Sequence, residues 1–332
     1  MLSRVAENLF WMARYMERVD GLARLMDQAF QVEFDTGFEE DSGGPMESIL
    51  EILGCGDRWP VNSGKWQLAS SQDLLRWLAF GRDGGCSLRS MVAMARENAR
   101  STQEALSAEA WNQINRFHLG LGSRKAERRF QASPTRFLDG IKRACVLFSG
   151  LIHDTLPRDE AYHFVQVGAY LERIDMTSRI LASAASHALG AVRALESKAE
   201  NGLPATLSPK KELEEVRWAL LLQSVGAQEA YLRRFRGQIS SEGVLRFLIL
   251  EQDFPRSLRF GLNRCLGSLQ EITGTDRSRY LPEAERLLGR LESDLHYQDP
   301  SDILQRGPVA FLGEVQAICA LVGNEIAKDC FV

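Results

Sequence analysis

The sequence predicts an all-α protein, a multi-helix bundle of roughly a dozen helices in which two long helices carry related motifs. Apolar residues recur with a helical period along almost the whole chain of 332 residues. No run of β-branched residues alternates with polar ones between turn signals, as a series of strands would require. A block reading Tyr-x-Glu-Arg-x-Asp-x-x-x-Arg occurs twice, at 15–24 and 170–179, inside two of the long helical stretches.

Long helices are expected at both ends of the N-terminal half, with shorter ones between them. Ser3 can cap the first long helix, which runs to about residue 34. Pro134 opens a helix that ends near residue 156, and Asp159 begins the second long helix, which ends near residue 189. The elements predicted between them are helices at 46–53, 65–80 and 87–106, a further helix from 107, and a polar connector at 123–133.

The C-terminal half is expected to follow a polar linker at 190–209, which ends in glycine and proline residues. Its predicted helices lie at about 210–235, 241–250, 253–272, 276–297 and 308–326. Asp253 and Pro255 signal the third of these, as an N-cap followed by a first-turn proline. We expect one domain over residues 1–332, with a subdivision into 1–190 and 210–332 as the alternative.

Composition excludes several classes of function. The formal charge is −4 and no basic block stands out, which argues against a nucleic-acid partner. The start of the chain lacks the apolar core of a secretory signal, and no apolar run approaches the length of about 20 residues that spans a bilayer, so no membrane is expected. The cysteines are scattered without a Cys-x-x-Cys pair, which predicts free thiols in the cytoplasm. They are Cys55, Cys86, Cys145, Cys265, Cys319 and Cys330.

The repeated block places its charged residues on one side of each helix. At about 100° per residue, the Glu, the Asp and the last Arg fall within roughly 60° of one another. They are Glu17, Asp20 and Arg24 in the first copy, and Glu172, Asp175 and Arg179 in the second. Three interpretations stay open: a solvated charged face, a partly buried ion-pair network that fixes register where the helices meet across a pseudo-twofold axis, or carboxylates that converge on a ligand or a hard cation such as Mg²⁺.

Two further polar clusters are candidates for anion binding. Arg96 and Arg100 lie four residues apart on a helix and repel each other unless a carboxylate such as Glu97, or an anion, lies between them. Arg256 and Arg259 are expected in the first turns of a helix, where free N–H groups already favour anions. Surface or inter-helix ion pairs explain both clusters without any ligand and are the favoured interpretation, and the alternative is recognition of a carboxylate or phosphate by arginine forks.

Complete catalytic motifs are missing from the sequence. The five histidines form neither His-x-x-x-His nor His-Glu-x-x-His, so a zinc site has no local support. No Gly-x-Ser-x-Gly and no complete phosphate loop occurs. The paired carboxylates are therefore the only candidates for acid–base or metal chemistry.

Four blocks of the sequence together resemble the bacterial alpha-E domain proteins, an all-helical family of unknown biochemical function. They are residues 1–18, 95–100, 172–179 and 253–257. Glu17 and Glu172 fit the glutamate of the family name, and Arg14 and Arg173 lie in the matching blocks. The resemblance implies an association with ATP-grasp amidoligase-like proteins and transglutaminase-like proteins, in systems that make or attach small peptides.

The expected function is that of a helical accessory or scaffold protein that binds such a partner or its peptide substrate. The alternative is an enzyme or ligand-binding bundle, so whether the chain is an enzyme stays open. Under the alternative, Glu17, Asp20, Glu172 and Asp175 act as bases or as Mg²⁺ or Mn²⁺ ligands, while Arg24, Arg96, Arg100 and Arg179 hold an anion. Otherwise no cofactor is expected, and a third interpretation is a purely structural homodimer.

Overall fold

The computed structural model describes residues 1–36, 45–60, 69–82, 85–200, 208–274, 282–297 and 307–331. Within these ranges it has 14 α-helices and no strand, which confirms the predicted all-α class. The helices are α1 (Ser3–Thr36), α2 (Pro45–Leu53), α3 (Ser71–Phe80), α4 (Leu88–Ser101), α5 (Ala108–Leu121), α6 (Arg124–Ala132), α7 (Pro134–Thr155), α8 (Glu160–Glu200), α9 (Ser208–Ser224), α10 (Gln228–Arg234), α11 (Ser241–Leu250), α12 (Leu258–Thr273), α13 (Glu283–Tyr297) and α15 (Pro308–Cys330).

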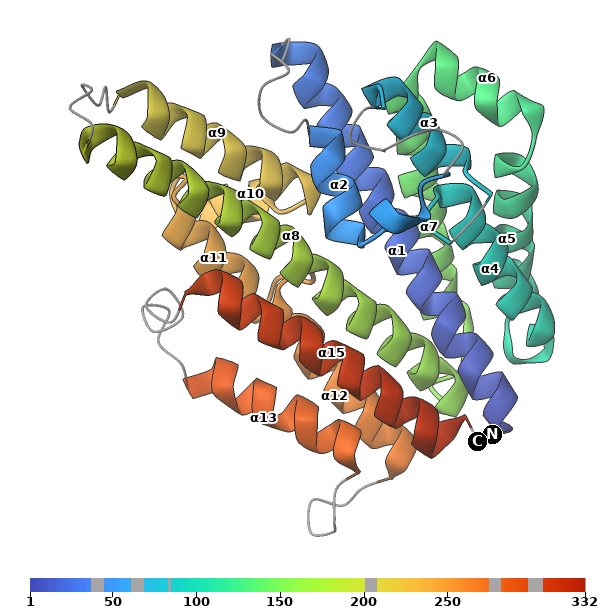
Figure 1. Ribbon diagram of the computed structural model, residues 1–332. Helices are drawn as coiled ribbons and strands as arrows, with labels where there is room; N and C mark the ends of the chain where they lie inside the picture. The colour runs from blue at the N-terminus through green and yellow to red at the C-terminus, as the bar shows by residue number, and fades with distance from the viewer. Residues whose placement is uncertain are drawn as a thin grey trace.

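Helices α1 and α8 are the two long helices, and they pack side by side in the centre of the molecule (Figure 1). They run in the same direction, because the Met1 ammonium lies 2.7 Å from Glu160 at the start of α8, while Gly21 on α1 lies against Met176 much further along α8. Their parallel course brings equivalent positions of the two sequence repeats to the same level.

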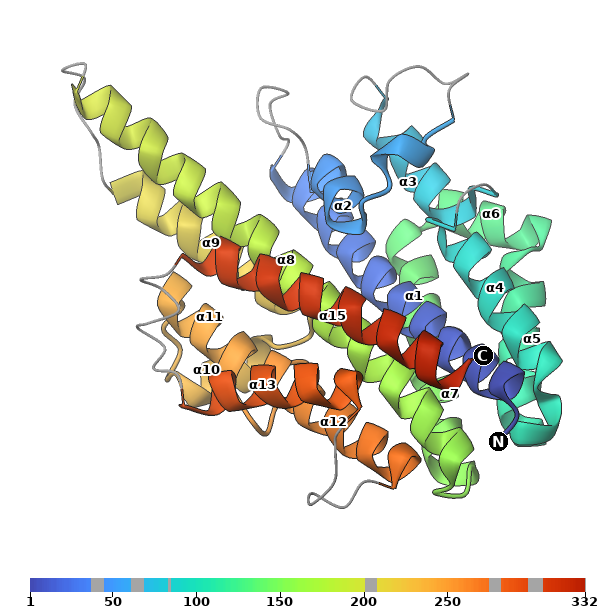
Figure 2. The same ribbon diagram turned by 60° about the horizontal axis from the view of Figure 1, so that its bottom comes forward.

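Two groups of helices cover this central pair (Figures 1 and 2). Helices α4 and α7 pack on α1, with α5 and α6 outside them, while α12 and α15 pack on α8, with α13 outside. The buried apolar side chains form one continuous cluster that extends from α1 to α15. α8 therefore packs against helices from both 1–190 and 210–332, the two segments that the sequence allowed as separate units.

Close approach of α1 and α8 depends on small residues. A Cβ atom at Gly168 would overlap the backbone carbonyl of Phe10, and one at Gly21 would lie 3.2 Å from Cγ of Met176. Only glycine fits at Gly168 without moving a backbone. The same pattern recurs where α12 meets α8, since a Cβ at Gly261 would lie 2.9 Å from Ile174.

Two segments predicted to be polar connectors contain helix. Residues 124–132 form α6, because Ala126 and Phe130 bury one side of it and the Phe130 ring packs 5.4 Å from that of Phe137. α8 continues to Glu200 instead of ending near residue 189, since a single glycine at position 190 does not terminate a helix of good helix formers. The rest of the predicted linker up to residue 207 lies outside the described residues.

Three helix boundaries also differ from the prediction. α3 begins at Ser71, where the side chain of Ser70 accepts a hydrogen bond from the backbone N–H of Asp73. The segment predicted as 210–235 is two helices, because the chain turns at Gly226 with φ +64°.

The third difference moves an expected anion site. α12 begins at Leu258, capped by Ser257, so Asp253 and Pro255 belong to the turn before it. Arg256 therefore precedes the cap, and only Arg259 lies in the first turn. The prediction that both arginines occupy the first turns of this helix is wrong.

Among the described helices, α15 alone is long and apolar enough to cross a membrane, judged by length and composition. Its most apolar window is 33% buried. In the structure α15 packs against α8 and α13 through side chains that include Phe311, Leu312 and Val315. The prediction that no apolar segment approaches the length that spans a bilayer is therefore wrong for α15.

Candidate functional site

The two Glu-Arg pairs of the repeats bind each other across the α1–α8 contact. Arg173 donates from Nε and Nη2 to the two carboxylate oxygens of Glu17, both at 2.7 Å. Arg18 donates from Nε at 2.5 Å and from Nη2 at 2.9 Å to the two oxygens of Glu172. Each glutamate is thus held by the arginine of the other repeat, the pattern of an approximate twofold axis between parallel helices.

The aspartates and last arginines of the repeats extend this arrangement. Arg24 donates to Asp20 at 2.8 Å and Arg179 donates to Asp175 at 2.9 Å, each within its own helix. An Asp and an Arg four residues apart on one helix form a favourable pair, and the repeats place both aspartates at this spacing from their arginines. The central network therefore matches the second of the three interpretations, a partly buried set of ion pairs where the two helices meet.

Each half of the network contains a third arginine. Arg14 donates to Glu172 at 2.8 Å, whereas Arg256 reaches Asp20 at 2.5 Å and lies 3.5 Å from Glu17. Three arginines thus surround two carboxylates in each half. Because Arg256 comes from the turn before α12, the network also ties that turn to the central helices.

The surroundings shift the pKa of three carboxyl groups. Burial alone would raise the pKa of Glu17, but the Arg173 guanidinium and the other arginines outweigh it and lower the pKa to about 2. The pKa of Glu172 is likewise lowered by Arg18 and Arg14 against the effect of burial. Burial and the neighbouring Glu172 charge raise the pKa of Asp175. A carboxylate with a pKa near 2 is a poor general acid or base at neutral pH, so Glu17 is suited to holding charge.

The remaining candidates lie apart from this network. On α4, Arg100 donates to Glu97 at 2.9 Å and Arg96 lies 3.3 Å from the same carboxylate, so Glu97 fills the position that an anion could have taken. The Arg259 guanidinium lies 2.6 Å from Nδ1 of His296. None of these residues lines the cavities beside the Glu-Arg pairs.

Two cavities of different size lie one on each side of the approximate twofold axis, and a third pocket of only about 10 Å³, lined by Glu17, Arg24, Arg173 and Arg256, also adjoins the network. The larger, of about 380 Å³, lies between α1, α7 and α8, and Glu17, Asp20 and Arg173 line its charged end. The smaller, of about 110 Å³, is lined by the corresponding Glu172, Asp175 and Arg18. The symmetry of the Glu-Arg pairs therefore extends to their surroundings, while the rest of each cavity wall differs.

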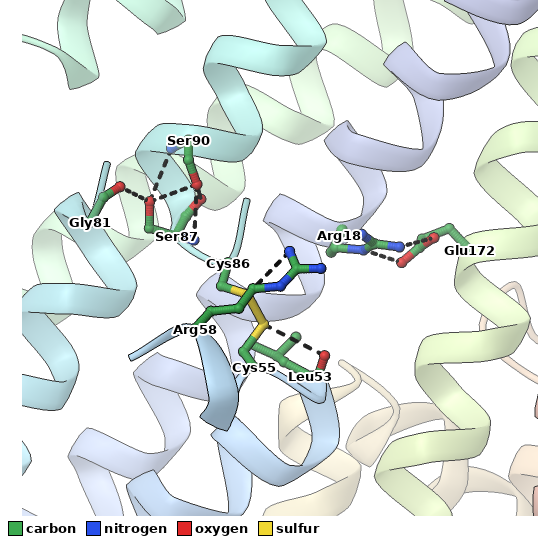
Figure 3. The surroundings of a disulfide bond; sticks show 9 residues. All are labelled: Arg18, Leu53, Cys55, Arg58, Gly81, Cys86, Ser87, Ser90 and Glu172. Atoms are coloured by element: carbon green, nitrogen blue, oxygen red, sulfur yellow. Dashed lines mark hydrogen bonds and ion pairs between the residues drawn. A yellow bond between two sulfur atoms is a disulfide. The ribbon is translucent and has the colours of Figure 1, made fainter. Parts of the chain in front are cut away.

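A disulfide bond forms part of the wall of the smaller cavity (Figure 3). Cys55, just after α2, and Cys86, just before α4, are joined with their Cα atoms 6.2 Å apart. Arg58 lies beside the bond (Figure 3) and lines the same cavity as Arg18 and Glu172. The prediction of six free thiols is wrong for these two, since the 31-residue separation gave no local motif and only the fold brings them together.

Metal binding finds little support in this geometry. Within the described ranges, no group of three or more His, Cys, Asp or Glu side chains is placed to hold a metal ion. The carboxylates that were candidates for Mg²⁺ or Mn²⁺ accept hydrogen bonds from guanidinium groups instead. A cation would have to displace those arginines.

A family model described as a predicted alpha-helical domain with a conserved ER motif matches residues 1–331. The chain belongs to the Alpha-E family. Its two Glu-Arg pairs, Glu17-Arg18 and Glu172-Arg173, are the places where this Alpha-E chain reads ER within the repeats. Arg18 was not among the candidate residues, although its alignment with Arg173 in the repeat was the signal that could have found it.

Curated relatives of this Alpha-E chain are themselves uncharacterized. An uncharacterized protein of Mycobacterium bovis and one of Mycobacterium tuberculosis are each 22% identical to it over 315 residues. The match covers 90% of this chain but 33% of each relative, so the chain spans about a third of their length. No solved structure matches.

Proposed function

We propose that this protein is a helical accessory or scaffold protein in a bacterial peptide-ligation or peptide-modification system. It binds an ATP-grasp amidoligase-like protein, a transglutaminase-like protein, or their peptide substrate. The observation that carries the proposal is the reciprocal pairing of the two ER motifs. Glu17, Arg18, Glu172 and Arg173 hold two helices in register, and a residue fixed in this way is not free to act on a substrate.

The relatives support a role beside other domains. Since their Alpha-E-like segment makes up a third of a longer chain, the domain there is covalently attached to further protein. A domain that works next to other domains needs a surface for them. In this chain, α7 exposes Val146 and Leu147 at 60% and 51%, and Val146 also lines the larger cavity. Neighbouring exposed apolar side chains are typical of a contact surface.

Co-purification tests the proposal. The tagged chain, isolated under mild conditions from the bacterium that encodes it, should carry an ATP-grasp amidoligase-like or transglutaminase-like protein, identified by mass spectrometry. Leu147→Asp on the proposed contact surface should release that protein, while Leu119→Asp, at an exposed leucine of α5, should retain it. Recovery of neither type of protein contradicts the proposal, and so does equal loss in both variants.

The second candidate function is a ligand-binding or catalytic bundle, favoured by the larger cavity with carboxylates and arginines at one end. Calorimetric measurement of the binding of Mg²⁺, Mn²⁺ or a small anion tests this second function. A structural homodimer would instead give a dimer that survives dilution in sedimentation experiments.

We also propose that the protein works in the cytoplasm, where glutathione keeps most thiols reduced. Cys55 and Cys86 should then be a dithiol in the cell and a disulfide after oxidation. Alkylation of intact cells followed by mass spectrometry distinguishes the two states, and complete protection of both thiols from alkylation contradicts this location.

A further inference from the structure

We propose that the cavity between α1, α7 and α8 binds a small amphipathic molecule with a carboxamide head, held between Asp20 and Arg256, and an apolar body. This cavity adjoins the contact surface proposed above, since Val146 belongs to both, but binding of a small molecule to the isolated chain needs no protein partner, so either proposal can fail without the other.

The size and lining of the cavity suit such a ligand. Its volume of about 380 Å³ lies within the range of about 300–1,000 Å³ that is usual for small-molecule sites. The charged groups gather at one end, next to the Glu-Arg network. Away from that end the lining is mostly apolar, with Ala13, Met16, Phe148, Ile152, Val165 and Ala169, although Ser149, His153, Gln166 and Tyr170 also contribute. A ligand that fills this space must be polar at one end and apolar along its body.

Asp20 provides an acceptor without a partner at the charged end. The residue is 4% exposed, and its Oδ2 accepts hydrogen bonds from Arg24 and Arg256. Its Oδ1 is buried and accepts no hydrogen bond from any described residue. A buried carboxylate oxygen that lacks a donor is costly to leave unmatched, so the ligand should bring an N–H or O–H group.

The charges around Asp20 decide between possible heads. Two carboxylates, Glu17 and Asp20, face three guanidinium groups, Arg24, Arg173 and Arg256, and the buried Cys145 thiol beside them is neutral because burial raises its pKa. An ammonium head would therefore enter a region with an excess of positive charge.

A carboxylate head would suit the guanidinium groups but would meet the unpartnered oxygen of Asp20 with a second negative oxygen. A carboxamide satisfies both sides, because its N–H donates to Oδ1 while its carbonyl accepts from Arg256.

The mouth of the cavity offers a place to block it without touching the charged end. Gly150 on α7 lines the cavity and is exposed, and a Cβ atom there would meet nothing within 4 Å. Gly140, on the same helix, is also exposed and equally open, but it does not line the cavity. Gly150→Phe and Gly140→Phe are therefore a matched pair, in which only the first should occupy the ligand space.

Calorimetric titration with three probes of equal body tests the proposal: 3-phenylpropanamide, 3-phenylpropanoate and 3-phenylpropylamine. The amide should bind at least about tenfold more tightly than the other two. Gly150→Phe should weaken binding of the amide by at least about tenfold, whereas Gly140→Phe should leave it unchanged. Circular dichroism verifies that both variants are folded.

Three outcomes would overturn the proposal. If none of the probes gives saturable binding, the cavity is not a site for this class of ligand. If the carboxylate or the ammonium probe binds most tightly, the assignment of the head to Asp20 and Arg256 is wrong. If Gly150→Phe binds the amide as well as Gly140→Phe does, the ligand lies elsewhere.

Discussion

Replacing Glu17 with glutamine removes the charge of one ER glutamate while keeping the size of its side chain. The arginines lower the pKa of Glu17 from its ordinary value of 4.5 to about 2. At about 1.4 kcal/mol per pKa unit, this difference corresponds to about 3 kcal/mol of stability at neutral pH. Removing one partner of a buried ion pair costs about 3–5 kcal/mol in other proteins, which is the same order.

The direction of the pKa shift of Glu17 determines how the cost of Glu17→Gln changes with pH. Because the folded-state pKa is the lower one, the stabilisation is present above pH 4.5 and is lost as the pH falls towards 2. The difference in unfolding free energy between wild type and Glu17→Gln should therefore shrink from about 3 kcal/mol at pH 7 to about 1 kcal/mol at pH 3.

Urea unfolding followed by circular dichroism at several pH values measures that difference. Glu97→Gln is the matched control, because Glu97 pairs with Arg100 on an exposed part of α4 and should contribute little. Glu17→Gln would refute the reasoning if it cost no more than Glu97→Gln, or if its cost were the same at pH 3 as at pH 7.

Three further predictions concern the same core. Gly168→Ala should lower the unfolding free energy by about 1–3 kcal/mol because its Cβ meets the Phe10 carbonyl, whereas Gly140→Ala should leave it unchanged or raise it by up to about 1 kcal/mol; equal effects in urea unfolding would contradict this. Asp175→Asn should cost less at pH 7 than Glu17→Gln, since the raised pKa of Asp175 means that its charged form is disfavoured in the folded protein; unfolding curves of the two variants compare them directly. Reduction of the Cys55–Cys86 bond should destabilise the oxidised protein by about 2–4 kcal/mol, seen as a lower melting temperature in dithiothreitol, and a Cys86→Ser variant should show no such response.

The helices that the sequence predicted well are those with a local signal at each end. The predicted helix starts at residues 87 and 107 coincide with the N-caps Ser87 and Ser107, each of which accepts a hydrogen bond from a backbone N–H in the first turn of its helix. α6 was missed because only two apolar residues in nine mark its buried side, and its polar composition suggested a connector. For α12, two residues with strong capping preference, Asp253 and Ser257, compete within five positions, and tertiary contacts select Ser257.

The candidate site shows a similar division. The repeat and its helical spacing indicated which residues share a face, and the i, i+4 pairs of Asp20 and Asp175 follow from that spacing alone. The exchange of partners between the two Glu-Arg pairs depends on the direction and register of α1 and α8, which are set by close approach at Gly168 and Gly21. Arg256 joins from a turn that lies 236 residues from Asp20 along the chain, and no local pattern could place it there.

The two ends of the described chain lie next to each other, at one pole of the molecule (Figure 1). The ring of Phe331 packs 5.5 Å from that of Phe10, so the contact between the ends is part of the core. A polypeptide joined to either end would begin from nearly the same point. In a longer protein, this domain would then branch to one side of the main chain path, and exchanging the order of its neighbours would hardly move their points of attachment.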